Sequence, residues 1–391
     1  MILERLTVIL PSILTVPAVK GGAVEQLLEN FIMQNEISPQ YYLDVVAHYK
    51  KEAKEKAKKY KYAVYHYIKL PDLIIRGNSV LYNKLNLYDI PDIWESSIIR
   101  KVRKIDNKKI LIEGGNIAIK MQERFPDKKI FFHIHSNWKI PRKKLKLINS
   151  SMSIICVSDF IRQKQIEQGV LPSRVKTVLN GIDVEHFEVN SKNNKKALKK
   201  YGVPEDAFVL LYKGRLVKEK GIVELIHAFE KMDRENVYLI IAGSLNFGQK
   251  RMNKSKYEKE INELVQNNDK IIVTGHIDYD KIMELHSIST VAVVPSLWEE
   301  PCALVVIEAL VSKIPLVTTK KGGIPELCKN TGAIVLEVDN NFINNLKDTL
   351  CTLYDNRNLL SEMINIKNSQ LEFFSNKRYF TDICQEISEN T

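Results

Sequence analysis

The chain has 391 residues, which is too long for one compact core and suits two domains of similar size. With 45% hydrophobic and 27% charged residues it has the composition of an ordinary globular protein. No run of about 18 apolar residues predicts a membrane-spanning helix. The five cysteines are odd in number and form no CxxC pair, which argues against a disulfide framework and a zinc site and favours a reducing, cytoplasmic setting.

The net charge of +11 is unevenly distributed along the chain. Residues 1–190 contain 31 Lys and Arg against 20 Asp and Glu, whereas residues 191–391 contain 27 of each kind. The excess is concentrated in residues 50–61, 100–109 and 139–146. It can be a solvated basic surface, or it can attract anionic lipid headgroups or a phosphate-bearing acceptor. Nucleic acid is disfavoured, because no aromatic-rich RNA motif or zinc finger accompanies the charge.

Short apolar runs in the first half predict strands that alternate with helices. Residues 1–11 are apolar but carry Glu4 and Arg5, so we expect them to hold the first strand rather than a signal peptide. The predicted strands are Leu6–Leu10, Leu43–His48, Lys109–Glu113, Ile130–His135 and Ile154–Val157, and the predicted helices are Ala23–Met33 and the highly charged Lys50–Lys61. Residues 188–200 are polar and rich in Lys and Asn, which predicts a linker.

The second half shows the same alternation more regularly. The predicted strands are Phe208–Lys213, Val237–Ala242, Lys270–Thr274, Thr290–Pro295 and Pro315–Thr319, and the predicted helices are Gly221–Met232, Tyr257–Val265, Asp280–His286 and Pro301–Ser312. A last helical stretch, 359–387, has a break near residues 375–376. Continuous apolar strands between helices indicate parallel sheets buried on both faces. We therefore expect an α/β protein with two doubly wound domains facing a cleft, and a ligand at the carboxyl ends of the strands.

The segment Val294–Ala309 is the most informative about function. Pro301 stands where the first residue of a helix should be, because its missing N–H is not needed there. Glu300 then precedes the helix and Glu308 lies roughly 12 Å further on, at about 1.5 Å per residue. Two carboxyls so far apart cannot share a proton, but they can hold two ends of one elongated ligand, with a phosphate at the helix N-terminus between them. Alternatively, Glu300 is a capping carboxylate and Glu308 a buried, paired acid.

Two more loops follow predicted strands of the same sheet. In the first, Gly214 permits a tight turn, and Arg215 and Lys220 can neutralise a diphosphate. In the second, Gly322 and Gly323 permit a close approach of the backbone to a ligand. An ordinary basic loop and a simple turn are the alternatives. Because the carboxyl ends of parallel strands lie at one edge of the sheet, we expect these loops to converge with the two glutamates.

Together these residues resemble glycosyltransferase family 4, a family of retaining enzymes with the GT-B fold that belongs to the group 1 glycosyl transferases. Glu300 and Glu308, separated by seven residues, match the signature pair of that family. The other matching segments are Gly214-Arg215, Lys220-Gly221, Gly322-Gly323-Ile324-Pro325-Glu326, Val157-Ser158 and Asn180-Gly181-Ile182-Asp183. The resemblance covers the C-terminal half well and the N-terminal half loosely.

The resemblance implies transfer of a hexose from a nucleoside diphosphate sugar, which we expect to be a UDP-sugar, to a hydroxyl group. The acceptor is expected to be a lipid-linked or surface-polysaccharide glycan. Arg215, Lys220 and the helix that begins at Pro301 are then expected to bind the donor diphosphate. Glu300 would contact the donor sugar, Glu308 the ribose, and the backbone N–H of Leu304 a phosphate.

The resemblance also implies a role for residues of the first half. Gly21 and Gly22 match the family's glycine loop beside the diphosphate and the acceptor. A histidine often stands at the end of an N-domain strand, close to the reacting sugar. His135 is our candidate and His133 the alternative, because both point to the same face of a strand at this spacing. Ordinary core histidines are the other interpretation.

The implied organisation is an acceptor-binding domain at residues 1–185, a donor-binding domain at 186–371, and a crossover helix at about 372–391 that returns to the first domain. The expected location is the cytoplasm, with contact to the inner face of the cell membrane. No metal or other cofactor is expected. The stretch Asp278-Tyr279-Asp280 spells the metal motif of the other glycosyltransferase fold, but it precedes a predicted helix, where an acid is a good N-cap.

Three other classes of protein stay open at this point. A nicotinamide enzyme would also be doubly wound, but the chain has no G-x-G-x-x-G after a strand. A non-catalytic sugar-nucleotide-binding protein is disfavoured by the intact Arg215, Lys220, Glu300 and Glu308. A sugar-nucleotide epimerase or hydrolase of GT-B type is disfavoured by the spacing of the two glutamates.

Overall fold

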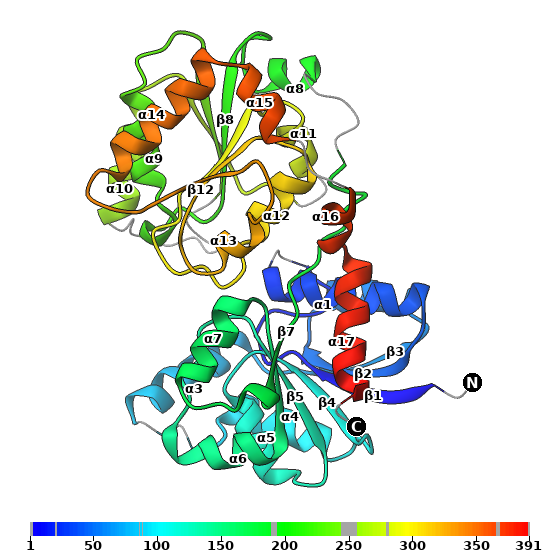
Figure 1. Cartoon of the computed structure of the whole chain (residues 1–391). Coiled ribbons are helices and arrows are strands. Elements are labelled where there is room, and N and C mark those ends of the chain that lie inside the picture. The colour runs from blue at the N-terminus through cyan, green and yellow to red at the C-terminus, as the bar shows by residue number, and fades with distance from the viewer. Residues whose placement is uncertain are drawn as a thin grey trace. The chain divides into compact units, whose positions relative to one another are not determined.

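The computed structural model of the chain describes residues 3–19, 22–85, 87, 89–188, 194–243, 256–278, 281–364 and 368–389 (Figure 1). Its contacts divide the chain into two compact units. The N-terminal unit comprises Met1–Gly181 with Ser375–Thr391, and the C-terminal unit comprises Ile182–Phe374. Each unit holds one parallel sheet flanked by helices (Figure 1).

The N-terminal unit is built on a seven-stranded sheet in the order β3-β2-β1-β4-β5-β6-β7. Its strands are β1 Glu4–Ile9, β2 Tyr41–His48, β3 Ala63–Ile68, β4 Lys109–Glu113, β5 Lys129–Ile134, β6 Met152–Cys156 and β7 Val175–Thr177. Its helices are α1 Ala23–Ile37, α2 Lys51–Ala57, α3 Asp72–Lys84, α4 Ile93–Val102, α5 Ile117–Arg124, α6 Leu145–Ser151, α7 Asp159–Glu167 and α17 Asn376–Glu389, with short 3-10 turns η1 Arg142–Lys144 and η2 Pro172–Arg174. The strand order reverses between β1 and β4.

The C-terminal unit is built on a six-stranded sheet in the order β10-β9-β8-β11-β12-β13. Its strands are β8 Phe208–Lys213, β9 Val237–Ala242, β10 Ile271–Gly275, β11 Val291–Val294, β12 Leu316–Thr319 and β13 Ile334–Leu336. Its helices are α8 Lys195–Lys200, α9 Ile222–Glu230, α10 Lys256–Gln266, α11 Ile282–His286, α12 Leu304–Val311, α13 Ile324–Leu327, α14 Phe342–Asp355, α15 Asn358–Met363 and α16 Asn368–Phe373, with a 3-10 turn η3 Lys218–Lys220. Here the strand order reverses between β8 and β11, which is where doubly wound sheets bind ligands.

Helix α17 completes the core of the N-terminal unit, although it comes last in the chain. Its Tyr379, Phe380 and Ile383 are buried among apolar side chains of β1, β2 and α1. The rings of Phe31 and Phe380 lie 5.1 Å apart between centroids. The chain passes close to the start of α17 at Gly181, where an added Cβ would meet the carbonyl oxygen of Ser375 at 2.7 Å.

The structure departs from the sequence predictions at the sheet edges, at one linker and at helices α3 to α7, α13 and α14, which were not predicted. The edge strands β3, β7 and β13 were not predicted either; β7 and β13 have only three residues each, too few for a clear apolar run. Part of the predicted linker is α8, which begins where the Asn194 side chain accepts a hydrogen bond from the backbone N–H of Ala197. The charged helix α2 ends at Ala57, earlier than predicted.

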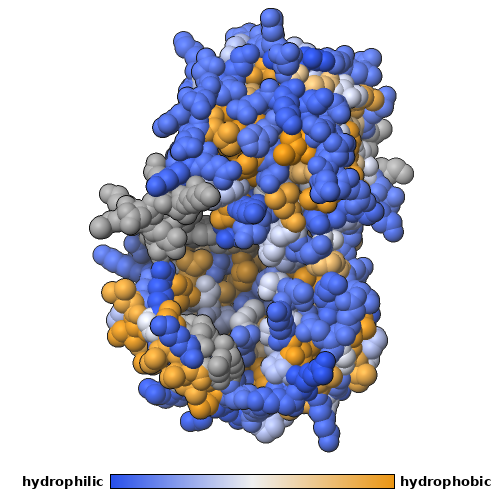
Figure 2. All heavy atoms as spheres, turned by 90° about the vertical axis from the view of Figure 1, so that its left-hand side faces the viewer, coloured by the Kyte–Doolittle hydropathy of each residue, from blue (hydrophilic) through white to orange (hydrophobic). Residues whose placement is uncertain are grey.

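The face of the molecule shown in Figure 2 is largely hydrophilic, but apolar side chains gather on it in patches. In the N-terminal unit most of the exposed large apolar side chains belong to one stretch, between Leu73 and Ile93. This stretch comprises α3, the loop after it and the start of α4. Single exposed apolar residues are normal on protein surfaces, whereas a contiguous group indicates a contact surface.

Replacing Ile383 by alanine should lower the unfolding free energy of the N-terminal unit by about 2–5 kcal/mol, because the side chain is fully buried and its removal leaves a cavity. The measurement is denaturant unfolding followed by the fluorescence of Trp94 and Trp138, in a background with Trp298 replaced by phenylalanine. The control is Ile37→Ala, at a side chain that is 73% exposed, which should change stability by no more than about 0.5 kcal/mol. Equal effects of the two substitutions would contradict the packing of α17.

Candidate active site

The carboxyl edge of the C-terminal sheet brings together the loops that follow β8, β11 and β12. The backbone N–H of Leu297 donates to the carbonyl oxygen of Glu219 at 2.9 Å, which joins the β11 loop to the β8 loop. The backbone N–H of Gly322 donates to the Glu299 carboxylate at 2.7 Å, which joins the β12 loop to the β11 loop. The predicted convergence of the three loops is therefore present in this unit.

Glu300 is a buried carboxylate held by two of these loops. Its Oε1 accepts a hydrogen bond from Nζ of Lys220 at 2.5 Å and another from the hydroxyl of Ser296. Its carbonyl oxygen accepts from the backbone N–H of Gly323 at 2.7 Å. Gly322, with a φ of 59°, passes so close that an added Cβ would lie 2.2 Å from that same carbonyl oxygen. Only glycine fits at position 322, which explains the first glycine of the predicted pair.

Glu308 is the second buried carboxylate, and it has its own lysine. It lies in α12, and its Oε2 accepts from Nζ of Lys213 at 2.5 Å. Lys213 is the last residue of β8, and its ammonium lies 6.0 Å from the centre of the Phe187 ring. The two glutamates thus neutralise two different lysines, and each pair joins the β8 loop to the segment around α12.

Two details of the predicted segment are wrong. Helix α12 begins at Leu304, with Ala303 as its N-cap, so Pro301 precedes the helix instead of opening it. The estimate of 12 Å between Glu300 and Glu308 assumed a continuous helix and does not apply. The residues 301–303 are needed to lead the chain from the Glu300 turn to the start of the helix, which then presents the backbone N–H groups of Leu304 and its neighbour.

The β8 loop has a left-handed residue at Gly221, with a φ of 67°. An added Cβ at Gly221 would meet the carbonyl oxygen of Pro295 at 1.9 Å. The Arg215 backbone is fixed, because its carbonyl oxygen accepts from the Tyr212 hydroxyl at 2.8 Å. Its side chain is exposed and makes no ion pair with the residues that the structure describes.

Sequence reasoning missed three polar residues of this edge: Lys213, Ser296 and Glu299. Each follows or ends a strand whose other residues are apolar, which is a signal for a ligand edge in a parallel sheet. Lys213 and Lys220 lie 95 and 80 residues from their glutamate partners, so no local sequence pattern predicts these pairs.

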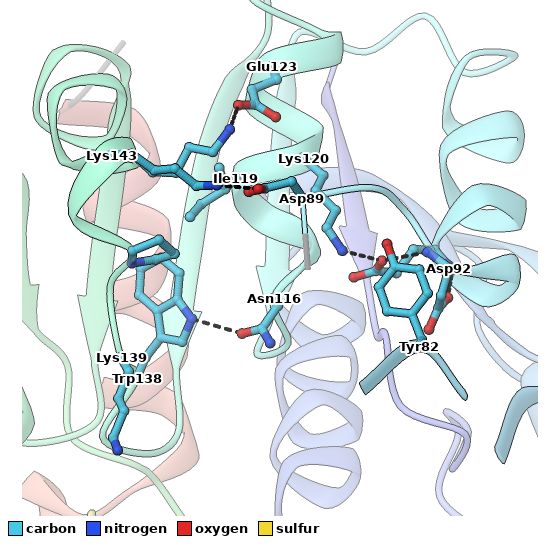
Figure 3. Close-up of a pocket in the computed structure, with 13 residues that line it drawn as sticks. Tyr82, Asp89, Asp92, Asn116, Ile119, Lys120, Glu123, Trp138, Lys139 and Lys143 are labelled. Atoms are coloured by element: carbon cyan, nitrogen blue, oxygen red, sulfur yellow. Dashed lines mark hydrogen bonds and ion pairs between the residues drawn. The ribbon is translucent and has the colours of Figure 1, made fainter. Parts of the chain in front are cut away.

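The N-terminal unit has a cavity of about 480 Å³ at the carboxyl edge of its own sheet (Figure 3). Trp138, after β5, donates its indole N–H to the side-chain oxygen of Asn116, after β4, at 2.9 Å. Lys120 of α5 pairs with Glu95 of α4 at 2.6 Å. The remaining lining residues are Tyr82, Asp89, Asp92, Ile119, Glu123, Lys139, Pro141, Lys143 and Lys144. The wall therefore offers carboxylates, ammonium groups and two aromatic rings, those of Tyr82 and Trp138.

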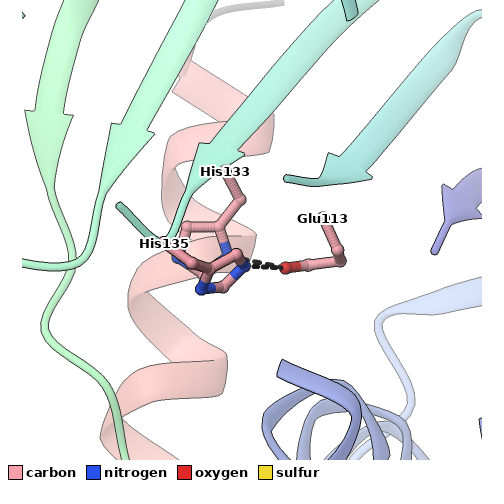
Figure 4. Close-up of side chains that lie close together, drawn as sticks. All are labelled: Glu113, His133 and His135. Carbon is pink, nitrogen blue, oxygen red and sulfur yellow. Dashed lines mark hydrogen bonds and ion pairs between the residues drawn. The ribbon is translucent and has the colours of Figure 1, made fainter. Parts of the chain in front are cut away.

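His133, in β5, and His135, directly after it, both contact one carboxylate, that of Glu113 (Figure 4). Oε2 of Glu113 lies 2.9 Å from Nδ1 of His133 and 2.8 Å from Nε2 of His135. Both histidines lie on the same face, as predicted. His133 and Glu113 are fully buried, whereas the His135 side chain keeps 13% of its surface exposed. His135 is thus the histidine that a ligand can reach, and Glu113 orients it.

The electrostatics of this cluster depend on the shared carboxylate. Burial by itself raises the pKa of Glu113, but the charge of His133 and the hydrogen bonds from both histidines lower it to about 2. Burial and the charge of His133 lower the pKa of His135, against the opposing effect of Glu113. Glu113 is therefore an anion and His135 a neutral imidazole at neutral pH.

The same three side chains are the group that could hold a metal ion, since one donor atom of each lies within 4.8 Å of the others. Metal-bound histidines usually donate their second ring N–H to a neighbour. The second ring nitrogen of His133 is buried and has no hydrogen-bond partner in the described part of the chain. The cluster is better explained as a hydrogen-bonded group, and the expectation of no metal stays a prediction.

Two predicted features fall partly outside the described residues. Gly21 is not described; Gly22 is the N-cap of α1, in an extended conformation, and an added Cβ there would meet the Glu25 carboxylate at 2.0 Å. Of the acidic stretch at 278–280, only Asp278 is described, and its carboxylate lies 3.7 Å from Nζ of Lys281, which occupies the N-cap position of α11.

Comparison with known proteins decides the family. The model of the family Glycosyl transferases group 1 matches residues 193–370. The putative glycosyltransferase YtcC of Bacillus subtilis is 30% identical over 340 residues, which cover 82% of this chain and 77% of that protein. This chain belongs to the group 1 glycosyl transferases.

Other relatives of this group 1 glycosyl transferase agree with that assignment. The lipopolysaccharide 1,2-N-acetylglucosaminetransferase of Salmonella typhimurium is 28% identical over 245 residues, which cover 62% of this chain and about three fifths (59%) of that enzyme's length. HepE of Anabaena, in complex with UDP and glucose, superposes with a TM-score of 0.76 at 16% identity over 99% of this chain and 100% of that one. The fold is therefore GT-B, which confirms the predicted α/β class with two Rossmann-like domains.

Within its described residues the glycosyl transferase has no helix that combines the length and the apolar character needed to cross a membrane. The contacts divide the chain after residues 181 and 374, whereas the sequence indicated boundaries after residue 185 and about residue 371. The difference at the second boundary arises because α16 belongs to the C-terminal unit and only α17 returns to the N-terminal unit.

Replacing Glu113 by glutamine should destabilise the N-terminal unit more above about pH 4.5 than below it. The folded pKa of Glu113, about 2, lies below its ordinary value of 4.5, so its stabilisation is present above about pH 4.5 and is lost as the pH falls toward 2. The difference in melting temperature between wild type and Glu113→Gln should therefore shrink below about pH 4.5. The control is Glu52→Gln, at an exposed residue of α2. A difference that grows in acid would contradict the assigned ionisation.

Proposed function

We propose that this chain transfers a hexose, with retention of anomeric configuration, from a UDP-sugar to a hydroxyl of a lipid-linked or surface-polysaccharide glycan in the cytoplasm. The observation that carries the proposal is the pair of lysine–glutamate contacts, Lys220 with Glu300 and Lys213 with Glu308, at the carboxyl edge of the C-terminal sheet. HepE, which binds UDP and glucose, supports the class of donor. The Salmonella relative, a lipopolysaccharide transferase by name, supports the class of acceptor.

The donor fits this edge as an elongated anion. Its diphosphate would lie at the N-terminus of α12, where the first backbone N–H groups, including that of Leu304, lack partners within the helix and the helix dipole is positive. Arg215 and Lys220 would supply the countercharge. Glu308 would accept hydrogen bonds from the ribose hydroxyls, and Glu300 from the sugar.

Binding of the donor requires an exchange of partners at Glu300. In the free protein the buried carboxylate is satisfied by Lys220 and Ser296. When Lys220 turns to the diphosphate, the sugar hydroxyls replace it as donors to Glu300, so that the buried carboxylate stays hydrogen-bonded. A nucleotide without its donor sugar lacks the sugar hydroxyls that would replace Lys220 as hydrogen-bond donors to Glu300. The arrangement therefore favours the intact donor over the free nucleotide.

The chemical step needs no nucleophile from the protein. The bond between the anomeric carbon and the diphosphate oxygen breaks while the acceptor oxygen bonds to that carbon on the same face of the sugar. The acceptor proton passes to the leaving phosphate oxygen. Arg215, Lys220 and the N-terminus of α12 stabilise the charge that develops on the diphosphate. His135, held by Glu113, is proposed to contact the reacting sugar, and no metal or other cofactor is involved.

The cavity at the carboxyl edge of the N-terminal sheet is the proposed acceptor site. Sugar hydroxyls both donate and accept hydrogen bonds, and the cavity wall offers carboxylates such as Asp92 beside ammonium groups such as Lys139. Trp138 adds an aromatic ring, a common neighbour of bound ligands.

A panel of UDP-, GDP- and dTDP-sugars should raise the melting temperature of the protein only with a UDP-sugar. At a donor concentration of 100 times Kd the gain is about 2.7 kcal/mol, or roughly 5–10 °C for a domain of this size. Glu308→Gln should reduce the shift, because it removes the ribose contact. No shift with any nucleotide-sugar would overturn the donor class, and fast release of UDP without an acceptor would favour the hydrolase alternative.

Lys220→Ala should lower kcat by about 10²–10³-fold, because one of the cations that stabilise the leaving diphosphate is lost. The matched control is Lys218→Ala, which removes an exposed lysine from the same loop. Lys220→Ala also removes the lysine that pairs with Glu300. A second variant, Lys220→Arg, therefore keeps the positive charge and should retain part of the activity. Melting temperatures are measured on each. Unchanged turnover of Lys220→Ala would contradict the assignment.

A further inference from the structure

The exposed apolar side chains of the described structure are concentrated in residues 72–93, which we call the α3 segment. It includes α3, part of the loop that follows, and the first residue of α4. Eight of the fifteen exposed large apolar side chains lie in it: Leu73, Ile74, Val80, Leu81, Leu85, Leu87, Ile90 and Ile93. On the face that carries α3, apolar side chains are gathered rather than scattered (Figure 2). Such a patch marks a contact surface.

The packing of α3 points to the same conclusion. Among its described side chains only Ile75 is buried, and Leu73 is 85% exposed. The helix has 13 residues and contains Gly77, which lowers its helix propensity. A helix of this length is marginal in water without a surface to pack on. The rest of the described chain offers α3 little such surface, so the apolar face needs a partner from outside.

Basic side chains lie next to this apolar surface. Lys143 of η1 pairs with Asp89 of the α3 segment, which places the basic stretch 139–146 beside it (Figure 3). In that stretch Lys139, Arg142 and Lys146 are exposed and have no acidic partner among the residues described. They are therefore available to an anionic surface.

The acidic groups of the α3 segment do not cancel this charge. Asp72 pairs with Lys50 at 2.9 Å, and Asp92 caps α4 by accepting from the backbone N–H of Glu95 at 2.8 Å. Glu95, just beyond the segment, pairs with Lys120. The surface that remains is apolar in its centre and positive at its side.

We propose that the α3 segment docks the protein on an anionic lipid bilayer, with its apolar side chains in the headgroup region and the basic stretch 139–146 on the lipid phosphates. Apolar area combined with basic charge is what binds peripheral proteins to such membranes. A second copy of the chain is a poorer partner, because a two-fold interface would bring the same unpaired cations of both copies together. Nucleic acid would use the charge but not the apolar side chains.

The proposed docking does not depend on which nucleotide-sugar is the donor. It would place the proposed acceptor site next to the membrane surface. Tyr82 and Asp89 of the α3 segment line the same cavity as Lys139 and Trp138. A bilayer that contacts the α3 segment therefore lies beside the cavity. A lipid-linked glycan can then enter the cavity while its lipid stays in the membrane.

Vesicle co-sedimentation of the full chain tests this surface. The wild type should bind vesicles of phosphatidylcholine and phosphatidylglycerol at least tenfold more tightly than vesicles of phosphatidylcholine alone. The double variant Leu81→Glu, Leu85→Glu should lose at least tenfold of that binding. The control, Ile37→Glu with Leu171→Glu, makes the same change at two exposed apolar residues elsewhere in the unit and should bind as the wild type does. Arg142→Ala with Lys146→Ala should weaken binding and its salt dependence.

Three results would overturn the docking surface. They are equal binding to neutral and anionic vesicles, equal loss in both double glutamate variants, and a dimer in sedimentation velocity that only Leu81→Glu, Leu85→Glu dissociates while vesicle binding is unchanged. The fluorescence of Trp94 and Trp138, measured in the Trp298→Phe background, verifies that each variant is folded. The UDP-sugar melting shift, measured on the same proteins, distinguishes failure of the docking surface from failure of the proposed function.

Discussion

The burial of two carboxylates at the edge of one sheet sets the arrangement of the C-terminal unit's candidate site. A buried charge is costly unless it is paired and hydrogen-bonded. Glu300 and Glu308 meet this condition through Lys220, in the loop after β8, and Lys213, the last residue of β8. The two ion pairs therefore hold α12 and the turn before it against that loop, and Gly221 and Gly322 allow the backbones to approach closely enough.

The same constraint is met differently in the N-terminal unit. There the buried carboxylate of Glu113 is shared by His133 and His135, and no lysine among the described residues pairs with it. Imidazoles are weaker and more adjustable countercharges than ammonium groups, because their ordinary pKa lies close to neutral pH. The result is a neutral, oriented His135 beside a fixed anion. Such a group suits contact with an uncharged sugar better than contact with a diphosphate.

Local patterns in the sequence predicted five strands of each sheet, but of the helices between the N-terminal strands they predicted only α1 and α2. The position of the loops after the strands predicted that Lys220 lies near Glu300 and Glu308. What the sequence could not predict depends on distant contacts. Lys213 finds Glu308 across 95 residues, and no local pattern distinguishes it from any lysine at a strand end. The start of α12 was misplaced for a related reason. Pro301 fits the first turn of a helix by propensity, but the turn around Glu300 is fixed by the loop after β12.

In the proposed function, the ion pairs would couple recognition of the sugar to recognition of the diphosphate. In the free protein Lys220 is occupied by Glu300, so this lysine is unavailable to a phosphate unless the glutamate gains other hydrogen-bond donors. Only a ligand that carries a donor sugar on its diphosphate would supply both halves of this proposed exchange, because the ribose hydroxyls are assigned to Glu308. Inorganic phosphate or a bare nucleotide would leave a buried carboxylate with one partner fewer, at a cost typical of an unsatisfied buried charge. Arg215 is exposed and has no acidic partner in the described chain. In the proposed function it would therefore be available to a phosphate without any exchange of partners.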